Sequence, residues 1–307
     1  MSADTARQQQ LPVSLSWSFT SAIKTWNASK SLLSASIATV LGQILSRTVA
    51  MAADASQVVA EAAASMAPSS SSFVSSLPPD LFDQTTIISL LSTLAIVLVA
   101  YLASRQFLPP TASGTLRFLF IWHLADALCH FILEGSFLYQ CFFTHQPIEG
   151  LDLSGYFPTP HNFLGYSDRL YGAQSGSDPF AQLWMVYAKA DKRWAGVDLG
   201  VVSLELLTVF FDGPLAVYVC YCLAKKDPKA SIWMIVLATC EIYGGFMTFC
   251  PEWLIGNLNL DTSNFMYLWV YLVFFNTLWV WIPLWVIWYS VRDISAALNE
   301  RQVKKNL

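Results

Sequence analysis

An apolar run at positions 116–143 constrains the fold most strongly, because it carries four ionisable side chains. The run is long enough to cross a bilayer as one helix. At about 100° per residue, these side chains share an arc of roughly 80° on one helical face: His123, Asp126, His130 and Glu134. Ionisable groups inside a membrane are costly, so we expect them to pair around an internal cavity. The run predicts a functional site, with a structural polar stripe between helices as the alternative.

The composition is that of a membrane protein. Hydrophobic residues make up 55% of the 307 residues and charged residues 12%, whereas soluble domains carry about 25% charged residues. The net charge of −4 is small and gives no sign of a nucleic-acid partner. The six cysteines lie almost wholly in apolar runs without a C-x-x-C pair. We therefore expect them to be small buried side chains rather than disulfides or metal ligands.

Three regions follow from composition. Residues 1–85 form a low-complexity extension rich in Ala and Ser, for which a transit peptide, an interfacial helix and a disordered segment all remain open. The apolar runs within residues 86–297 predict an all-α membrane domain, a bundle of five transmembrane helices around an intramembrane cavity. Residues 298–307 are a basic C-terminal tail.

The five expected spans are residues 87–104, 116–143, 197–224, 231–250 and 267–290, with a long polar loop at 145–195. Nine basic residues fall on the side of the membrane that holds the C-terminus: Arg105, Arg117, Lys225, Lys226, Lys229, Arg292, Arg301, Lys304 and Lys305. The opposite side has four, all in the long loop: Arg169, Lys189, Lys192 and Arg193. Cytoplasmic loops carry the excess of basic residues, so the counts predict a multi-pass protein with a cytosolic C-terminus.

The later spans add side chains of matching chemistry: Asp198, Glu205, Thr208 and Asp212 on the third, Glu241 and Tyr243 on the fourth, Asn276 and Trp279 on the fifth. No nucleotide-binding, zinc-protease or serine-nucleophile motif is present in the sequence. Metal binding by the histidines and carboxylates at i, i+4 spacing is a weaker alternative. An acid, a base and an aromatic wall in an apolar cavity suit proton addition to an alkene and loss of a neighbouring proton. That reaction needs no cofactor.

Several motifs in register resemble the emopamil-binding protein family, the sterol isomerases that move the ring-B double bond from position 8 to 7 in the endoplasmic reticulum. The similarity covers residues 86–297. It rests on these stretches: His130-Phe-Ile-Leu-Glu134-Gly, Leu183-Trp-Met-Val-Tyr-Ala-Lys-Ala-Asp191, Leu204-Glu205-x-x-Thr208 with Gly213-Pro214, Glu241-Ile-Tyr-Gly244, and Asn276-Thr-Leu-Trp279 with Pro283.

The resemblance implies five catalytic residues. His130 and Glu134 match the family's His and Glu on the second span, and Glu205 matches its carboxylate on the third. This group is taken to deliver and remove protons. Asn276 matches the amide that helps fix the carboxylates, and Trp279 matches the indole that faces the carbocation.

A second set is expected to shape the substrate pocket: Asp126, Tyr187, Asp198, Thr208, Asp212 and Tyr243. Family isomerases have small or apolar residues at the positions of His123 and Asp126, an aromatic residue at Asp212, and an Asp at Gly245. These departures point to a paralogue, of a fungal type, whose cavity is retuned for another polyene or terpenoid.

The sequence thus predicts a sterol delta-8 to delta-7 isomerase-like enzyme of the endoplasmic reticulum membrane. The alternatives are a terpenoid or meroterpenoid isomerase or cyclase that uses the same acid, and a sterol-binding protein without turnover. The expected partners are a sterol or terpenoid substrate and membrane lipids, with no metal and no cofactor. A homodimer is left open.

Overall fold

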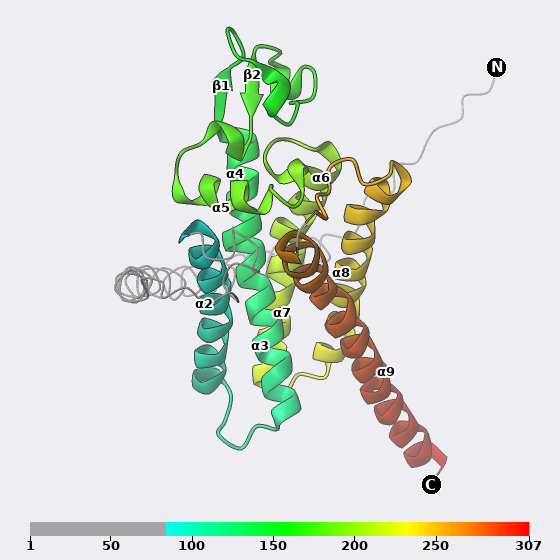
Figure 1. Cartoon of the computed structure of the whole chain (residues 1–307). Coiled ribbons are helices and arrows are strands. Elements are labelled where there is room, and N and C mark those ends of the chain that lie inside the picture. The colour runs from blue at the N-terminus through cyan, green and yellow to red at the C-terminus, as the bar shows by residue number, and fades with distance from the viewer. Residues whose placement is uncertain (1–83, 264, 307) are drawn as a thin grey trace, which may run out of the picture. The chain divides into compact units, whose positions relative to one another are not determined.

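The structure, a computed structural model, describes residues 84–263 and 265–306. The expected N-terminal extension at 1–85 lies almost wholly outside the described residues. The described part of the chain is mostly helical (Figure 1). The all-α class is therefore confirmed.

Two of the expected spans are continuous helices in which an α–π–α sequence replaces a uniform α-helix. In the first, α3 (Gly114–Leu128), the π-helical segment η2 (Cys129–Glu134) and α4 (Gly135–Phe143) follow one another. In the second, α6 (Leu199–Leu207), η7 (Thr208–Asp212) and α7 (Gly213–Lys225) do the same. Short π-helical segments inside α-helices occur often at functional sites, and here each carries predicted site residues.

The remaining long helices are α2 (Gln84–Phe107), α8 (Lys229–Leu254), and η8 (Met266–Phe275) continued by α9 (Asn276–Asn306). Four helices in the described residues are long and apolar enough to cross a membrane: Gly114–Phe143, Leu199–Lys225, Lys229–Leu254 and Met266–Asn306. Only a shorter apolar stretch, Thr93–Phe107, is found in α2. α9 also continues through residues 298–306, where the sequence predicts a separate tail.

The lateral surface of these helices is apolar, as expected for a membrane protein. Many of its large side chains are exposed in the isolated chain: Leu94, Leu98, Leu207, Phe210, Phe246, Trp281, Leu284 and Trp288. Soluble proteins rarely expose so many large apolar side chains along their helices. Contact with lipid hydrocarbon removes the cost of exposing them to water.

The loop between the second and third spans folds into a small lobe at one end of the long helices (Figure 1). Its strands β1 (His145–Pro147) and β2 (Arg169–Tyr171) are antiparallel, and His145 pairs with Tyr171. Gly172 follows β2 with φ +109°, and a Cβ there would lie 2.5 Å from the Gly196 Cα. Only glycine fits this turn without strain. The lobe also holds α5 (Pro179–Tyr187), which begins where Asp178 accepts a hydrogen bond from the Phe180 amide.

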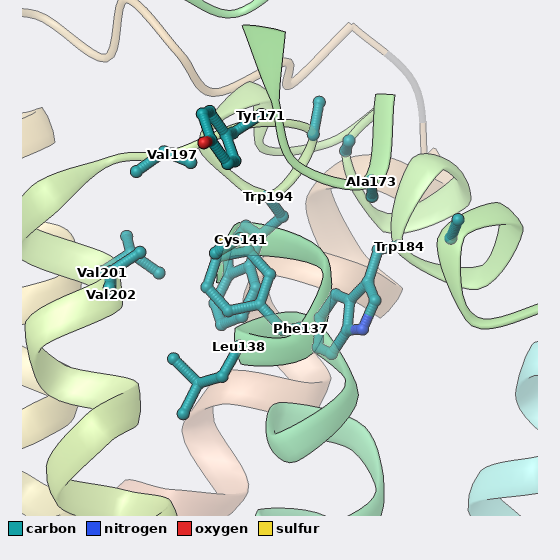
Figure 2. Close-up of a cluster of buried hydrophobic side chains, with 13 residues drawn as sticks. Phe137, Leu138, Cys141, Tyr171, Ala173, Trp184, Trp194, Val197, Val201 and Val202 are labelled. Atoms are coloured by element: carbon teal, nitrogen blue, oxygen red, sulfur yellow. The ribbon is translucent and has the colours of Figure 1, made fainter. Parts of the chain in front are cut away.

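An aromatic cluster joins this lobe to the helices (Figure 2). The rings of Trp184 and Trp194 are stacked with centroids 4.8 Å apart, and Phe137 of α4 lies 4.7 Å from Trp194. The Trp184 indole N–H donates to Ser136 at 2.9 Å. Burial of three large rings contributes several kcal/mol by area, of order 1.5–3 kcal/mol for a side chain such as Phe. The cluster fixes α5 against α4, and with it Tyr187.

A buried ion-pair network holds the other side of the lobe to the end of α8. Arg193 is 3% exposed and makes two hydrogen bonds to Asp191, at 2.9 and 2.6 Å. It also donates to the Thr248 carbonyl at 2.7 Å, and its Nε atom lies 3.7 Å from Glu252. Because the guanidinium satisfies both carboxylates, neither charge is left buried and unpaired.

Candidate active site

A cavity of about 230 Å³ lies among the long helices and α5. Apolar residues such as Leu133, Leu183 and Phe275 form much of its wall. Its polar lining comes from η2, α6, η7, α8 and α9: His130, Glu134, Glu205, Thr208, Asp212, Glu241 and Asn276. The cavity therefore combines an apolar surface with a concentrated set of ionisable groups, which marks a functional site inside a membrane protein.

His130 is at the centre of this set and is 3% exposed. Its Nδ1 atom lies 2.7 Å from Glu134 Oε2, and its Nε2 atom lies 3.2 Å from Asp126 Oδ1. The Nδ1 atom donates to Glu134, because a carboxylate oxygen only accepts, while Nε2 is within ion-pair distance of Asp126 without a hydrogen bond to it. Two carboxylates this close favour the protonated imidazole. Such a ring carries a positive charge, and the two flanking carboxylates compensate for it in the apolar surroundings.

Glu134 and Glu205 form a carboxyl pair on one side of His130. The two carboxyl groups are in contact with each other. The Thr208 hydroxyl donates to Glu134, and its oxygen lies 3.1 Å from Glu205 Oε2. Two carboxyl groups in contact cannot both be ionised without strong repulsion, so the pair holds a proton. The structure thus places a transferable proton at the cavity wall.

Close packing of η2 and α7 brings the second and third spans together at this point. A Cβ on Gly213 would lie 3.0 Å from the Phe131 ring and 3.3 Å from the His130 Cβ. The absence of a side chain at position 213 therefore allows the two spans to approach. Glu134 and Thr208, each in a π-helical segment, meet as a result.

Asp126 lies on the other side of His130 and is 1% exposed. The Trp279 indole N–H donates to Asp126 Oδ1 at 2.8 Å, and the ring of Trp122 lies 5.5 Å from that of Trp279. The carboxyl group of Glu241 on α8 lies against that of Asp126. The hydrogen bond to Asp126 fixes the orientation of the Trp279 ring at the cavity wall.

Asn276 contacts helix carbonyls and a tyrosine instead of the carboxylates that the resemblance implies. Its Nδ2 atom lies 2.8 Å from the Tyr271 carbonyl, 3.0 Å from that of Leu272, and 3.1 Å from the Tyr187 hydroxyl. The π-helical turn of η8 leaves these carbonyls available to a side chain. Burial raises the pKa of the Tyr187 hydroxyl, so this group remains neutral and able to hydrogen-bond at the cavity.

All five residues that the resemblance makes catalytic line the cavity, as do Tyr187, Thr208 and Asp212. The other predicted residues lie elsewhere. Asp126 is buried behind His130 and outside the lining. Asp198 caps α6 by accepting from the Val201 amide at 2.9 Å, and Tyr243 is 62% exposed on α8. These two side chains do not reach the cavity.

Two further residues differ from the expectation. His123 was expected with the polar set, but its Nδ1 atom donates to the Leu119 carbonyl at 2.7 Å, outside the cavity lining. Glu241, which the sequence places among the polar side chains of the fourth span without a catalytic or pocket role, lines the cavity. A lone carboxyl group in an apolar span was the available signal. Among residues 84–263 and 265–306, no three His, Cys, Asp or Glu side chains are arranged to hold a metal ion.

Comparison with known proteins finds similarity to one family over part of the chain. The model of the EXPERA (EXPanded EBP superfamily) family matches residues 179–290. The 3-beta-hydroxysteroid-Delta(8),Delta(7)-isomerase of Cavia porcellus is 29% identical over 164 residues, which are 53% of this chain and 66% of that enzyme. A probable enzyme of the same name from Oryza sativa is 27% identical over 216 residues, 70% of this chain and 83% of the relative.

A third relative has a different product. The protoglabretal synthase of Ailanthus altissima is 28% identical over 194 residues, 63% of this chain and 74% of the synthase. The resemblance to the emopamil-binding protein family is confirmed at the family level by these matches.

Proposed function

We propose that this protein is an isomerase that moves a carbon–carbon double bond in the ring system of a sterol. Relatives named as isomerases and synthases support an enzyme that rearranges its substrate internally. The observation that carries the proposal is the Glu134–Glu205 carboxyl pair, which holds a proton beside the His130 imidazolium at the wall of an apolar cavity.

The first step of the proposed reaction is proton transfer from Glu205 to one carbon of the alkene. A C–H bond forms from the π electrons, the O–H bond breaks, and the neighbouring carbon becomes cationic. The ring of Trp279 lines the cavity where this charge develops, and an indole face attracts a cation most strongly where water is excluded. The ionised carboxyl group adds an opposite charge nearby.

The second step removes a proton from the carbon on the other side of the cation. That C–H bond supplies the electron pair of the new double bond, and a carboxylate at the wall takes the proton. One proton enters and one leaves, so the product is an isomer of the substrate. The reaction balances without an oxidant, a reductant or a cofactor.

The size of the cavity bears on how the substrate is held. Sites that enclose a whole drug-sized ligand measure about 300–1,000 Å³, and this cavity is about 230 Å³. We therefore propose that it holds the reacting rings, while the remainder of the lipid lies between helices or in the bilayer. Apolar lining residues such as Leu133 and Leu204 suit that surface.

The proposed setting is the endoplasmic reticulum membrane, with five spans and a cytosolic C-terminus. α2 is 24 residues long and supplies Thr93 to the cavity wall, which supports its role as the first of the five spans. The excess of Lys and Arg on the side of the C-terminus supports the orientation.

Expression in a host that lacks the 8-to-7 sterol isomerase tests the function. We expect delta-7 sterols to appear by mass spectrometry and the delta-8 precursor to fall. A rearranged terpenoid with unchanged sterols would replace the proposal by the terpenoid alternative. If neither sterols nor terpenoids change but the protein still binds sterol, the non-enzymatic binding alternative would replace the proposal.

A further inference from the structure

His130 has a carboxyl pair on each side, and the mechanism above uses only one of them. The connected groups run in the order Glu205, Glu134, His130, Asp126 and Glu241. Each outer member, Glu205 from α6 and Glu241 from α8, lines the same cavity. The inner members connect them through the imidazole ring. The arrangement is thus close to symmetric about His130.

The second pair also holds a proton. Asp126 and Glu241 are 1% and 7% exposed, and their carboxyl groups lie against each other. Among the described residues, no hydrogen-bond donor reaches Asp126 Oδ2 or Glu241 Oε1. Two buried carboxylates left facing each other would be strongly destabilising, so a proton lies between them. The Trp279 indole N–H donates to Asp126 Oδ1, and His130 Nε2 lies 3.2 Å from the same oxygen, which favours Asp126 as the ionised member.

Asp212 adds charge on the same side of the cavity. It is 3% exposed, lines the cavity, and its Oδ1 atom has no hydrogen-bond partner among the described residues. Its position near Asp126 and Glu241 disfavours ionisation of all three groups together. The proton on Glu241 is therefore held at the cavity surface.

We infer that Glu241 is a second acid–base residue, which exchanges one proton with the substrate while Glu205 exchanges the other. Asp126, His130 and Glu134 relay a proton between the two. This inference rests on the proposed alkene isomerisation and assigns its two proton transfers to different helices.

When Glu241 is the proton donor, its O–H bond breaks, and the π electrons of the alkene form a C–H bond with the proton. Glu205, ionised while Glu134 carries the proton of their pair, takes the proton that leaves the neighbouring carbon of the cation, so the pair then holds an additional proton. His130 passes its Nε2 proton to Asp126, and a proton passes from Asp126 to Glu241. The neutral ring then turns so that its vacant Nε2 accepts the additional proton from Glu134, and it turns back. Every group regains its initial state without exchange with water.

Infrared spectroscopy of the full chain in detergent tests the second protonated pair without any substrate. We expect the carbonyl stretch of protonated carboxyl groups to lose one component in Glu241→Gln and a different component in Glu205→Gln. Glu300→Gln is the matched control, because Glu300 is exposed on α9. A Glu241→Gln spectrum identical to that of the wild type would overturn the inference.

A single turnover with a 3β-hydroxy delta-8 sterol, deuterated at carbon 7, tests whether two different residues carry out the two proton transfers. Two separate residues predict that no deuterium moves to carbon 9, and that Glu241→Gln lowers kcat at least about a hundredfold. Transfer of the label to carbon 9, or full activity of Glu241→Gln, would overturn the inference while the isomerase function stands. No conversion by the wild type would instead overturn the proposed function.

Discussion

Glu205 differs from an ordinary buried carboxyl group because of its immediate neighbours. It contacts the Glu134 carboxyl group and lies 3.1 Å from the Thr208 hydroxyl. The carboxyl contact supplies a proton to donate, and the nearby His130 imidazolium stabilises the anion that donation leaves. The same residue is therefore equipped both to give and to take a proton.

Replacement of Glu205 by Gln keeps the side-chain size but removes the exchangeable acid. We expect turnover of a delta-8 sterol to fall at least about a hundredfold. Binding of a neutral sterol should persist, whereas a cationic amine should bind more weakly because a carboxyl group is lost. Product formation and ligand binding, measured on the same preparation, separate the two effects. Unchanged turnover would remove Glu205 from the chemistry.

Trp279 has two separable roles, a ring at the cavity and an N–H bound to Asp126. Trp279→Phe keeps an aromatic face, whereas Trp279→Leu removes it. A desolvated cation–π contact is worth about 2 kcal/mol, so we expect Trp279→Leu to be roughly thirtyfold slower than Trp279→Phe. Comparison of kcat for the two variants measures this. Equal rates would show that the ring does not stabilise the cation.

The residue types of the site could be predicted from the sequence, but not the direction in which every side chain points. The i, i+4 spacing of Asp126, His130 and Glu134 brings them together as expected. Glu241 and Tyr243 are two positions apart, so they point to opposite sides of α8 and cannot both face one cavity. The position of Asp198 just before an apolar helix is typical of an N-cap, which is the role it has.

At the scale of elements, the π-helical segments shape the site. η2 and η7 carry Glu134 and Thr208 at the point where the second and third spans touch, and η8 ends directly before Asn276. The sequence gives no sign of these segments, because hydrophobic periodicity does not distinguish a local π turn from α-helix. The contacts of Asn276 with the Tyr271 and Leu272 carbonyls were unforeseen for the same reason.

Gly213 is the point at which this close approach can be tested. In Gly213→Ala the new Cβ would lie 3.0 Å from the Phe131 ring and 3.3 Å from His130 Cβ, so the spans must separate slightly. Overpacking of this kind costs about 1–3 kcal/mol, and a displaced His130 should lower kcat about tenfold or more. Thermal unfolding in detergent and sterol turnover are the measurements.

Gly114→Ala is the matched control, because a Cβ at this first residue of α3 meets nothing within 4 Å. It should leave both stability and turnover close to those of the wild type. If Gly213→Ala behaves like this control, the close packing of η2 and α7 does not position the site.

At the scale of the whole molecule, long apolar helices hold the polar site and a folded lobe covers one end of the bundle (Figure 1). Four of the helix positions were predictable because their apolar runs reach the length that a bilayer requires. The lobe was predicted only as a polar loop. Its core of Phe137, Trp184 and Trp194 joins segments distant in sequence, and such pairings leave no local pattern.

The predicted orientation places the basic side of the bundle in the cytosol. A protease-sensitive tag after Leu307 should therefore be cleaved in intact microsomes, because the positive-inside rule puts the C-terminus outside the lumen. A tag in the lobe near residue 150 should be protected until detergent is added. Protection of the C-terminal tag in sealed vesicles would reverse the topology.

The central claim is that buried carboxyl groups exchange protons with an alkene, and turnover in deuterated water tests it most directly. Purified protein with all its exchangeable sites deuterated should convert a 3β-hydroxy delta-8 sterol into the delta-7 isomer with one deuterium at carbon 9 in the first turnover. Mass spectrometry and NMR of the product locate the label. An isomer formed without deuterium would contradict the account, because the proton would then not come from the protein.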